Sequence, residues 1–187
     1  MGKVAVFIDG GYLDKVMFFD HGNKRVDLQK LVEQISKPDE LLRAYYYHCL
    51  PYQSSPPTGE ESGRFASMQR FVTALSRLPH FQVRLGKLAY RGIDEHGEKI
   101  FIQKRVDTMV GVDMALLAGK GKITRVAFLS GDSDLIPAIQ AVKNEGVVVT
   151  LWHGSYSKET SPSQELYNIC DDRILLSTGL ISEILKF

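Results

Sequence analysis

The sequence predicts an α/β fold: a three-layer sandwich with a mostly parallel central sheet, built as one domain over residues 1–187. Short apolar runs rich in β-branched residues alternate with longer segments of helical pattern. The runs are continuously apolar, which is typical of parallel strands covered on both faces. A chain of 187 residues with 44% hydrophobic residues is long enough to bury a full core of its own.

The elements follow one another in a regular order. The first strand is KVAVFID, in which five apolar residues precede an aspartate, and three later runs share its apolar character. Strands are therefore expected over residues 3–9, 41–50, 125–131 and 147–153. Helices are expected between and after them, over residues 27–36, 63–78, 106–119 and 135–146.

Two segments depart from this alternation. Residues 51–62 (PYQSSPPTGEES) form a Pro/Ser-rich loop, because the adjacent prolines Pro56 and Pro57 oppose regular structure. Residues 81–105 contain two strand-like runs joined by a turn around DEHGE. We expect a hairpin that extends the edge of the sheet, and an exposed edge strand favours a homodimer.

Composition excludes several classes of protein. Lys and Arg total 23 and Asp and Glu total 22, so nucleic acid would have to be bound by a local patch rather than by a global positive field. The two cysteines, Cys49 and Cys170, have no CxxC partner, which argues against a zinc site and favours a reducing compartment. Because no run resembles a signal peptide or membrane span, we expect a cytoplasmic protein without membrane contact.

Carboxylates follow two of the most hydrophobic predicted strands. Asp9 ends the first strand in VFIDGG, and Asp132 and Asp134 follow another in AFLSGDSD. Ligands of open parallel sheets bind beyond the carboxyl ends of the strands. A third contribution is Asp107, at the start of a predicted helix, with Asp113 six residues later and about 240° around that helix. Asp113 is therefore the weaker candidate.

Carboxylates in a cluster repel one another unless a cation lies between them. Oxygen ligands without a nearby His or Cys set suit Mg²⁺ or Mn²⁺ rather than zinc. Each aspartate also has a simpler interpretation: Asp9 with its two glycines as a turn, Ser133 or Asp134 as a helix cap, and Asp107 as a charge that favours a helix start. The recurrence of all four at matched positions favours the metal site.

The sequence resembles the NYN domain family, in its bacterial LabA-like branch within the PIN-like nuclease superfamily. The segments that carry the resemblance are VAVFIDGGYL, KRVDTMVGVDMALLA and VAFLSGDSDLIPAIQAVKNEGVVVTLW, whose order and spacing cover most of the chain. The resemblance implies a PIN-like α/β fold and a metal-dependent ribonuclease. Carried over residue by residue, it implies an acidic site of Asp9, Asp107, Asp132 and Asp134.

One position departs from that family. An Asn is frequent three residues after the first-strand Asp, where this chain has Tyr12, and the change puts catalytic efficiency in doubt. The candidates for contact with RNA are residues near the acidic edge. They are Tyr12, Lys104, Arg105, Ser130 and Ser133, although the two serines also suit turns.

Other features are less specific. The spacing of Arg84, Lys87 and Arg91 prevents all three from sharing one face of a strand. The consecutive tyrosines 45–47 must alternate between the two faces of a strand. No pair of histidines has a metal-ligand spacing, and Trp152 is expected in the core.

Two rival functions remain open. DSDL has a superficial likeness to the DxD motif of haloacid-dehalogenase-type phosphatases, although Asp132 lies too late in the chain for their nucleophile. A non-catalytic RNA-binding or regulatory module is the other, supported by Tyr12 and by the near-neutral charge of the chain.

Overall fold

A seven-stranded sheet forms the centre of the molecule in the computed structural model, which describes residues 2–97, 99–155 and 157–186. The spatial order of its strands is β4-β3-β2-β1-β5-β6-β7. Their bounds are β1 Lys3–Asp9, β2 Glu40–Cys49, β3 Phe81–Ile93, β4 Lys99–Lys104, β5 Arg125–Leu129, β6 Val148–His153 and β7 Asp172–Leu175. All neighbouring pairs are parallel except β3 with β4, which confirms a mostly parallel sheet.

The strand order places β1 at the middle of the sheet, between β2 and β5. Ile8 pairs with Tyr46 on one side and with Leu129 on the other, so the three strands end at a common edge. Chain connections leave β1 toward β2 and return on its other side to β5, which makes this edge the place where the strand order reverses. In open parallel sheets that place is the usual binding site for ligands.

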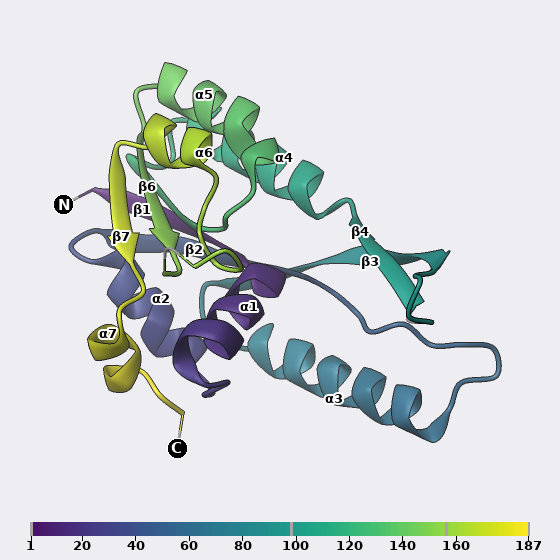
Figure 1. The fold of residues 1–187 in the computed structure, drawn as a ribbon. Helices are drawn as coiled ribbons and strands as arrows, with labels where there is room; N and C mark the ends of the chain where they lie inside the picture. The colour runs from purple at the N-terminus through teal and green to yellow at the C-terminus, as the bar shows by residue number, and fades with distance from the viewer. Residues whose placement is uncertain (1, 98, 156, 187) are drawn as a thin grey trace.

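Helices cover both faces of the sheet, as Figure 1 shows. One core cluster lies between the sheet and a first group of helices: α1 (Gly10–His21), α2 (Leu28–Ser36), α3 (Gly59–Leu75) and α7 (Thr178–Glu183). A second cluster lies on the opposite face, under a second group: α4 (Val106–Gly119), α5 (Ile136–Asn144) and α6 (Gln164–Ile169). The three-layer sandwich is thereby confirmed.

Helix α1 was not predicted, because the pair Gly10-Gly11 after Asp9 suggests only a turn. The helix begins directly at Gly10, and Asp9 caps it by accepting a hydrogen bond from the backbone N–H of Tyr12 (3.1 Å). Gly10 allows the helix to approach β2 closely, since a Cβ at this position would lie 2.5 Å from both Tyr46 Oη and His48 Cδ2. The first glycine of the pair is thus a packing requirement.

The loop predicted over residues 51–62 is wrong in its last four residues, because α3 begins at Gly59. A capping box stabilises this start: Thr58 accepts from the N–H of Glu61, whose side chain accepts in return from the N–H of Thr58. The same helix ends at Leu75, three residues before the predicted limit. Helices α6 and α7 and strand β7 were not predicted, since each has six residues or fewer.

The hairpin predicted over residues 81–105 is confirmed, and β4 forms one edge of the sheet. Its turn includes Glu98, which lies outside the described residues. Both cysteines are buried free thiols, and Trp152 is buried, as expected. Among the described helices, none has the length and apolar character needed to span a bilayer.

Candidate functional site: a carboxylate cluster at the sheet edge

Three separate segments bring carboxylates to the carboxyl edge of the sheet. Asp9 ends β1, Asp107 lies in the first turn of α4, and Asp132 follows β5. A small pocket at this edge is lined by Asp9 and Asp107 together with Ser130. Its remaining walls are apolar and come from β1, β5, α4 and the loop before α5: Phe7, Val110, Phe128, Leu129 and Leu135.

Burial and a neighbouring negative charge act together on Asp9. Burial raises the pKa of its carboxyl above the usual 3.8, and the charge of Asp107 raises it further. The N–H groups of Tyr12 and Gly11 and the nearby His48 act in the opposite direction, but they do not cancel the increase. The ionised form of Asp9 is therefore destabilised in the metal-free protein.

Asp107 has the same kind of environment. Burial raises the pKa of its carboxyl, and the charges of Asp132 and then Asp134 raise it further. The electrostatic coupling of Asp107 with Asp9 on one side and with the Asp132–Asp134 segment on the other links the three segments into one acidic cluster. The four predicted aspartates therefore lie at one edge of the sheet, where Asp107 interacts electrostatically with the other three.

The segment after β5 is shaped by short-range hydrogen bonds. Asp132 Oδ1 accepts from the N–H of Asp134 (2.9 Å) and caps a short 3₁₀ turn, Ser133–Leu135. Ser130 is buried, and its hydroxyl accepts from the N–H of Asp132 (3.3 Å). Ser130 therefore positions Asp132 and is not exposed for contact with RNA, whereas Ser133 is half-buried at the mouth of the loop.

Asp113 does not join the cluster. Its carboxylate accepts from the phenol of Tyr47 (2.8 Å) and forms an ion pair with Arg84 (Nε to Oδ2, 3.1 Å). The reason is the helical angle between positions 107 and 113, which turns the second carboxylate toward β2 and β3. Asp113 therefore anchors α4 to the sheet, and Arg84 is occupied in that ion pair.

The position of Tyr12 does not suit the role in RNA contact that was predicted for it. Its side chain is buried, and its phenol donates to the carbonyl of Thr160 (2.5 Å) and accepts from the N–H of Gly154 (3.0 Å). Burial raises the pKa of this phenol to about 12. A Cβ at Gly131 would lie 2.7 Å from the Tyr12 ring, so the ring also supports the loop that carries Asp132. Tyr12 is a structural support of the site.

Lys104 and Arg105 are exposed and directly precede α4, beside Asp107. Arg105 adopts a left-handed backbone conformation (φ 77°, ψ −12°) and is the N-cap of this helix without a side-chain capping bond. Few residues other than glycine adopt this conformation. The sharp change of direction from β4 into α4 sets Asp107 at the acidic edge and leaves both cationic side chains in solvent.

Two residues of this site were not among the predicted candidates. His48 lies near the end of β2 and contacts Asp14 of α1 (Nε2 to Oδ2, 3.0 Å). Burial lowers the pKa of His48, but the hydrogen bond and charge of Asp14 and the charge of Asp9 outweigh it, so the pKa stands above 6.5. Gln103 of β4 lies next to Gly11 and close to Asp9. A Cβ added to Gly11 would lie 3.0 Å from Gln103 Nε2 and 3.4 Å from Asp9 Oδ1. The position of His48 at a strand end was the available signal, whereas nothing in the sequence marks Gln103.

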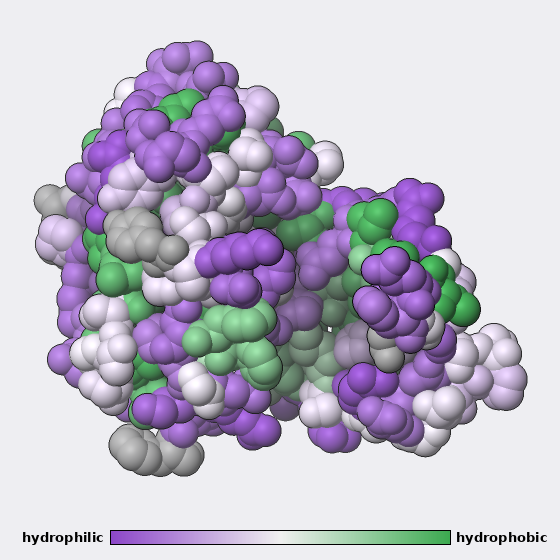
Figure 2. Space-filling model, viewed as in Figure 1, coloured by the Kyte–Doolittle hydropathy of each residue, from purple (hydrophilic) through white to green (hydrophobic). Residues whose placement is uncertain are grey.

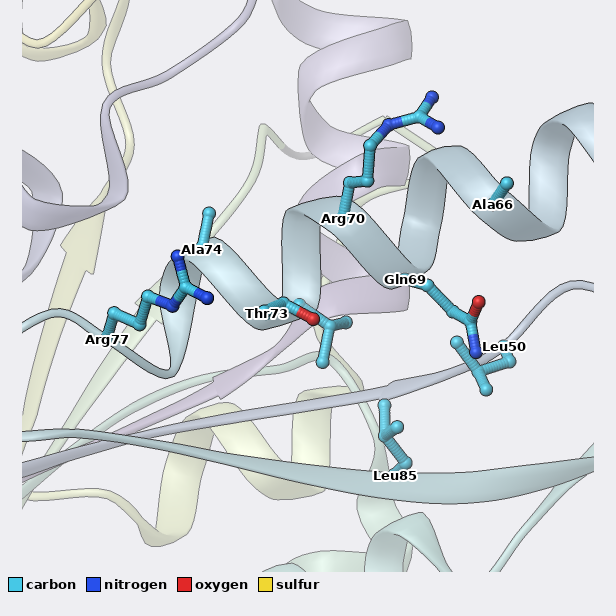
Figure 3. A pocket seen from close by; sticks show the side chains of 9 residues that line it. Leu50, Ala66, Gln69, Arg70, Thr73, Ala74, Arg77 and Leu85 are labelled. Atoms are coloured by element: carbon cyan, nitrogen blue, oxygen red, sulfur yellow. The ribbon is translucent and has the colours of Figure 1, made fainter.

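A larger hollow lies apart from the carboxylates. Figure 2 shows an indentation between the main body and the part of the molecule formed by α3 and the hairpin. A cavity of about 640 Å³ between α3 and β3 is lined by Arg70 and Arg77 above Leu50 and Leu85, as Figure 3 shows. None of the cluster aspartates lines this cavity, so the chemistry of the site is not located there.

The chemistry of the donors at the acidic edge fits a hard divalent cation. The cluster offers carboxylate oxygens, which are the ligands that Mg²⁺ and Mn²⁺ prefer. Burial and the charges of Asp9 and Asp107 raise the pKa of the nearby Cys49 thiol, so its metal-binding thiolate form is disfavoured. Within the part of the chain that the structure describes, no three His, Cys, Asp or Glu side chains already converge at ligand spacing.

The fold and the site together define an α/β domain with an acidic centre at the carboxyl edge of a parallel sheet. The sequence matches the NYN domain family over residues 3–177, and the chain belongs to that family. A comparison of the sequence with curated proteins found no match.

Solved structures that are similar to this chain have low sequence identity to it. A protein of unknown function from Vibrio parahaemolyticus RIMD 2210633 is 16% identical, with a TM-score of 0.58 over 99% of this chain and 96% of its own. The catalytic domain of the CheB methylesterase from Thermotoga maritima is a more distant likeness: 14% identity and a TM-score of 0.44, over 97% of this chain and 96% of the domain. The first likeness supports the fold alone.

Proposed function

We propose that this NYN protein is a ribonuclease that hydrolyses RNA phosphodiester bonds with the help of Mg²⁺ or Mn²⁺. The observation that carries the proposal is the cluster of aspartates from three distant segments, in which burial and mutual repulsion raise the pKa of both Asp9 and Asp107. Such a cluster is costly for a fold without a ligand, and perturbed carboxylates gather at functional sites. Membership of the NYN family supports the nuclease chemistry.

Asp9, Asp107, Asp132 and Asp134 would hold the cation; Asp113 is left out because it is already bound to Arg84. A divalent cation held by these carboxylates would supply the positive charge that activates water for attack on phosphorus and that stabilises the leaving oxygen. Ser130 fixes the backbone of Asp132, and Asp9 is oriented by its hydrogen bond from Tyr12 N–H.

The remaining residues at the edge are assigned to the substrate and to local charge. Lys104 and Arg105 are free in solvent next to Asp107, so they can contact the phosphates that flank the scissile bond. His48 contributes positive charge near Asp9 when it is protonated, which favours the ionised carboxylate.

Within the family, we assign the chain to the LabA-like branch and to the PIN-like superfamily, on the segments VAVFIDGGYL and SGDSDLIPAI. A cytoplasmic location agrees with the two buried free thiols. A homodimer through the edge strand β4 is a further proposal, since Ile100 and Ile102 of that strand are exposed.

The experiment that tests the function compares labelled RNA with p-nitrophenyl phosphate as substrates, each in Mn²⁺ and in EDTA. We expect cleavage of RNA in Mn²⁺, no cleavage in EDTA, and no hydrolysis of the small ester. Asp132→Asn keeps the shape and the capping oxygen but removes the charge, so it should abolish cleavage; Asp113→Asn serves as the matched carboxylate outside the cluster and should retain it. Cleavage by Asp132→Asn at the wild-type rate contradicts the proposal.

A non-catalytic RNA-binding module is the second candidate. The observation that favours it is the absence, in residues 2–97, 99–155 and 157–186, of three ligand side chains already at metal-binding spacing. That function predicts binding of RNA that is equal in Mn²⁺ and EDTA, with the RNA recovered intact. The same assay therefore separates the two candidates.

A further inference from the structure

The hairpin of β3 and β4 carries a cluster of three aromatic rings that no part of the acidic site uses. Tyr52, from the segment after β2, lies 4.9 Å from Phe101 of β4 and 6.1 Å from Tyr90 of β3, between ring centroids. Tyr90 and Phe101 lie 5.9 Å apart. Figure 1 shows this hairpin projecting beyond the rest of the sheet. The rings therefore pack on one another outside both core clusters.

The cluster is open to solvent. The side chain of Tyr90 is 46% exposed, while Tyr52 and Phe101 are half-buried. A cation also lies on it, since Lys99 Nζ stands 5.1 Å from the centroid of the Tyr52 ring and is held by Glu61 of α3 (3.4 Å). A partly exposed group of aromatic rings with an adjacent cation is the arrangement on which bases of single-stranded nucleic acid stack.

The register of the hairpin connects these rings with the acidic site. Tyr90 lies directly opposite Phe101, and Leu88 lies directly opposite Gln103. Because side chains two residues apart share a face of a strand, Phe101 and Gln103 lie on the same face of β4. Gln103 is the residue whose amide reaches Gly11 beside Asp9. Along this face of β4, Gln103 lies beside Asp9 and Phe101 is the next side chain. Only Gln103 therefore separates the carboxylates from the aromatic cluster on this face.

The length of this path suits a nucleic-acid strand. Two residues of a β-strand span roughly 7 Å, which corresponds to about two nucleotides at the 3.4 Å spacing of a stacked strand. Ile100 and Ile102 of the edge strand alternate with Phe101 and Gln103, so the two isoleucines lie on the opposite face of β4. A second copy of the chain paired through those isoleucines would leave the aromatic face uncovered.

We propose that Tyr52, Tyr90 and Phe101 form a stacking site for unpaired bases of the RNA strand that is held at the carboxylate cluster. The inference rests on the proposed function and deepens it, because it makes single-stranded RNA the substrate class. Duplex RNA keeps its bases stacked within the helix and has no face to offer these rings.

Binding of a fluorescein-labelled single-stranded RNA of about ten nucleotides, measured by anisotropy in EDTA, tests this inference without any cleavage. Removing one stacked ring costs about 1–3 kcal/mol per base, so Tyr90→Leu should weaken binding by roughly 5- to 150-fold. Tyr90→Phe keeps the ring and should bind within about twofold of wild type, by the same principle. Leu116→Ala changes an exposed apolar residue near the C-terminal end of α4 and is the matched control.

Three results would overturn the inference. The first is wild-type affinity in Tyr90→Leu, with thermal unfolding showing that the variant is folded. The second is duplex RNA of the same sequence bound as tightly as the single strand. The third is a wild-type dimer in light scattering that Tyr90→Leu converts to a monomer, which would assign the rings to an interface between copies. If ring-dependent binding is found but Mn²⁺ supports no cleavage, the stacking site stands and the nuclease proposal fails alone.

Discussion

Replacement of Asp9 by Asn should make the metal-free protein more stable while removing its function. Asn retains a side-chain oxygen that can accept from the N–H of Tyr12, so the cap of α1 is kept. What is lost is a negative charge whose ionised form is disfavoured by burial and by Asp107. A residue kept for capping alone would give no such gain.

The sign and size of the effect follow from proton linkage. Because the pKa of Asp9 in the folded protein is raised above 3.8, the unfolded chain releases this proton first as the pH rises. The free energy of unfolding therefore falls between pH 3.8 and the raised pKa and stays lower at neutral pH. The loss amounts to about 1.4 kcal/mol for each pKa unit. Each kcal/mol corresponds to roughly 2–4 °C in Tm for a domain of this size.

Urea unfolding in EDTA from pH 3.5 to pH 7.5 measures this effect, and wild type and Asp9→Asn should diverge as the pH rises. Asp27→Asn is the matched control, because Asp27 caps α2 in the same way, by accepting from the N–H groups of Gln29 and Lys30. This control should follow wild type at every pH. An Asp9→Asn protein that is less stable than wild type at pH 7 would refute the reasoning.

Three further substitutions test the support of the site. Gly131→Ala should lower the free energy of unfolding by roughly 1–3 kcal/mol and slow RNA cleavage, because the new Cβ would lie 2.7 Å from the Tyr12 ring. An unchanged urea midpoint together with an unchanged cleavage rate would contradict this. Tyr12→Phe should cost roughly 1–3 kcal/mol in urea unfolding, because it leaves the buried N–H of Gly154 and carbonyl of Thr160 without this partner. Arg105→Gly should raise the melting temperature by relieving the positive φ but weaken RNA binding; a lower melting temperature would count against the strained backbone.

The layers of the fold could be predicted because apolar runs and helical patterns depend on local sequence. The bounds of α4 agree with the prediction at both ends, and β1 agrees likewise. Helix α1 was missed since its two initial glycines have low helix propensity, although the buried positions Tyr12, Leu13, Val16 and Met17 have helical spacing. Tertiary contact with β2 outweighs that local preference.

The acidic site was predictable to the extent that it depends on topology. Asp9 and the Asp132–Asp134 segment follow parallel strands that end at one edge, which the sequence pattern alone indicates. Asp107 lies in the first turn of α4 and is linked to them by electrostatic coupling. The pairing of Asp113 with Arg84 and the burial of Tyr12 depend on tertiary contacts across more than 25 positions of the chain, which no local pattern shows. Gln103 was missed for the same reason. The single domain over residues 1–187 stays a prediction.

Calorimetric titration of the metal-free protein with Mn²⁺ tests the central claim most directly, because the claim is that the carboxylate cluster binds a divalent cation. We expect saturable binding by wild type. Because the pKa values of the Asp9 and Asp107 carboxyls are raised, these groups should release protons on binding when the titration is done near those pKa values. Asp107→Asn should lose most of this binding, and Asp113→Asn should keep it. No detectable heat of binding by wild type at millimolar Mn²⁺, or equal binding by Asp107→Asn, would contradict the account.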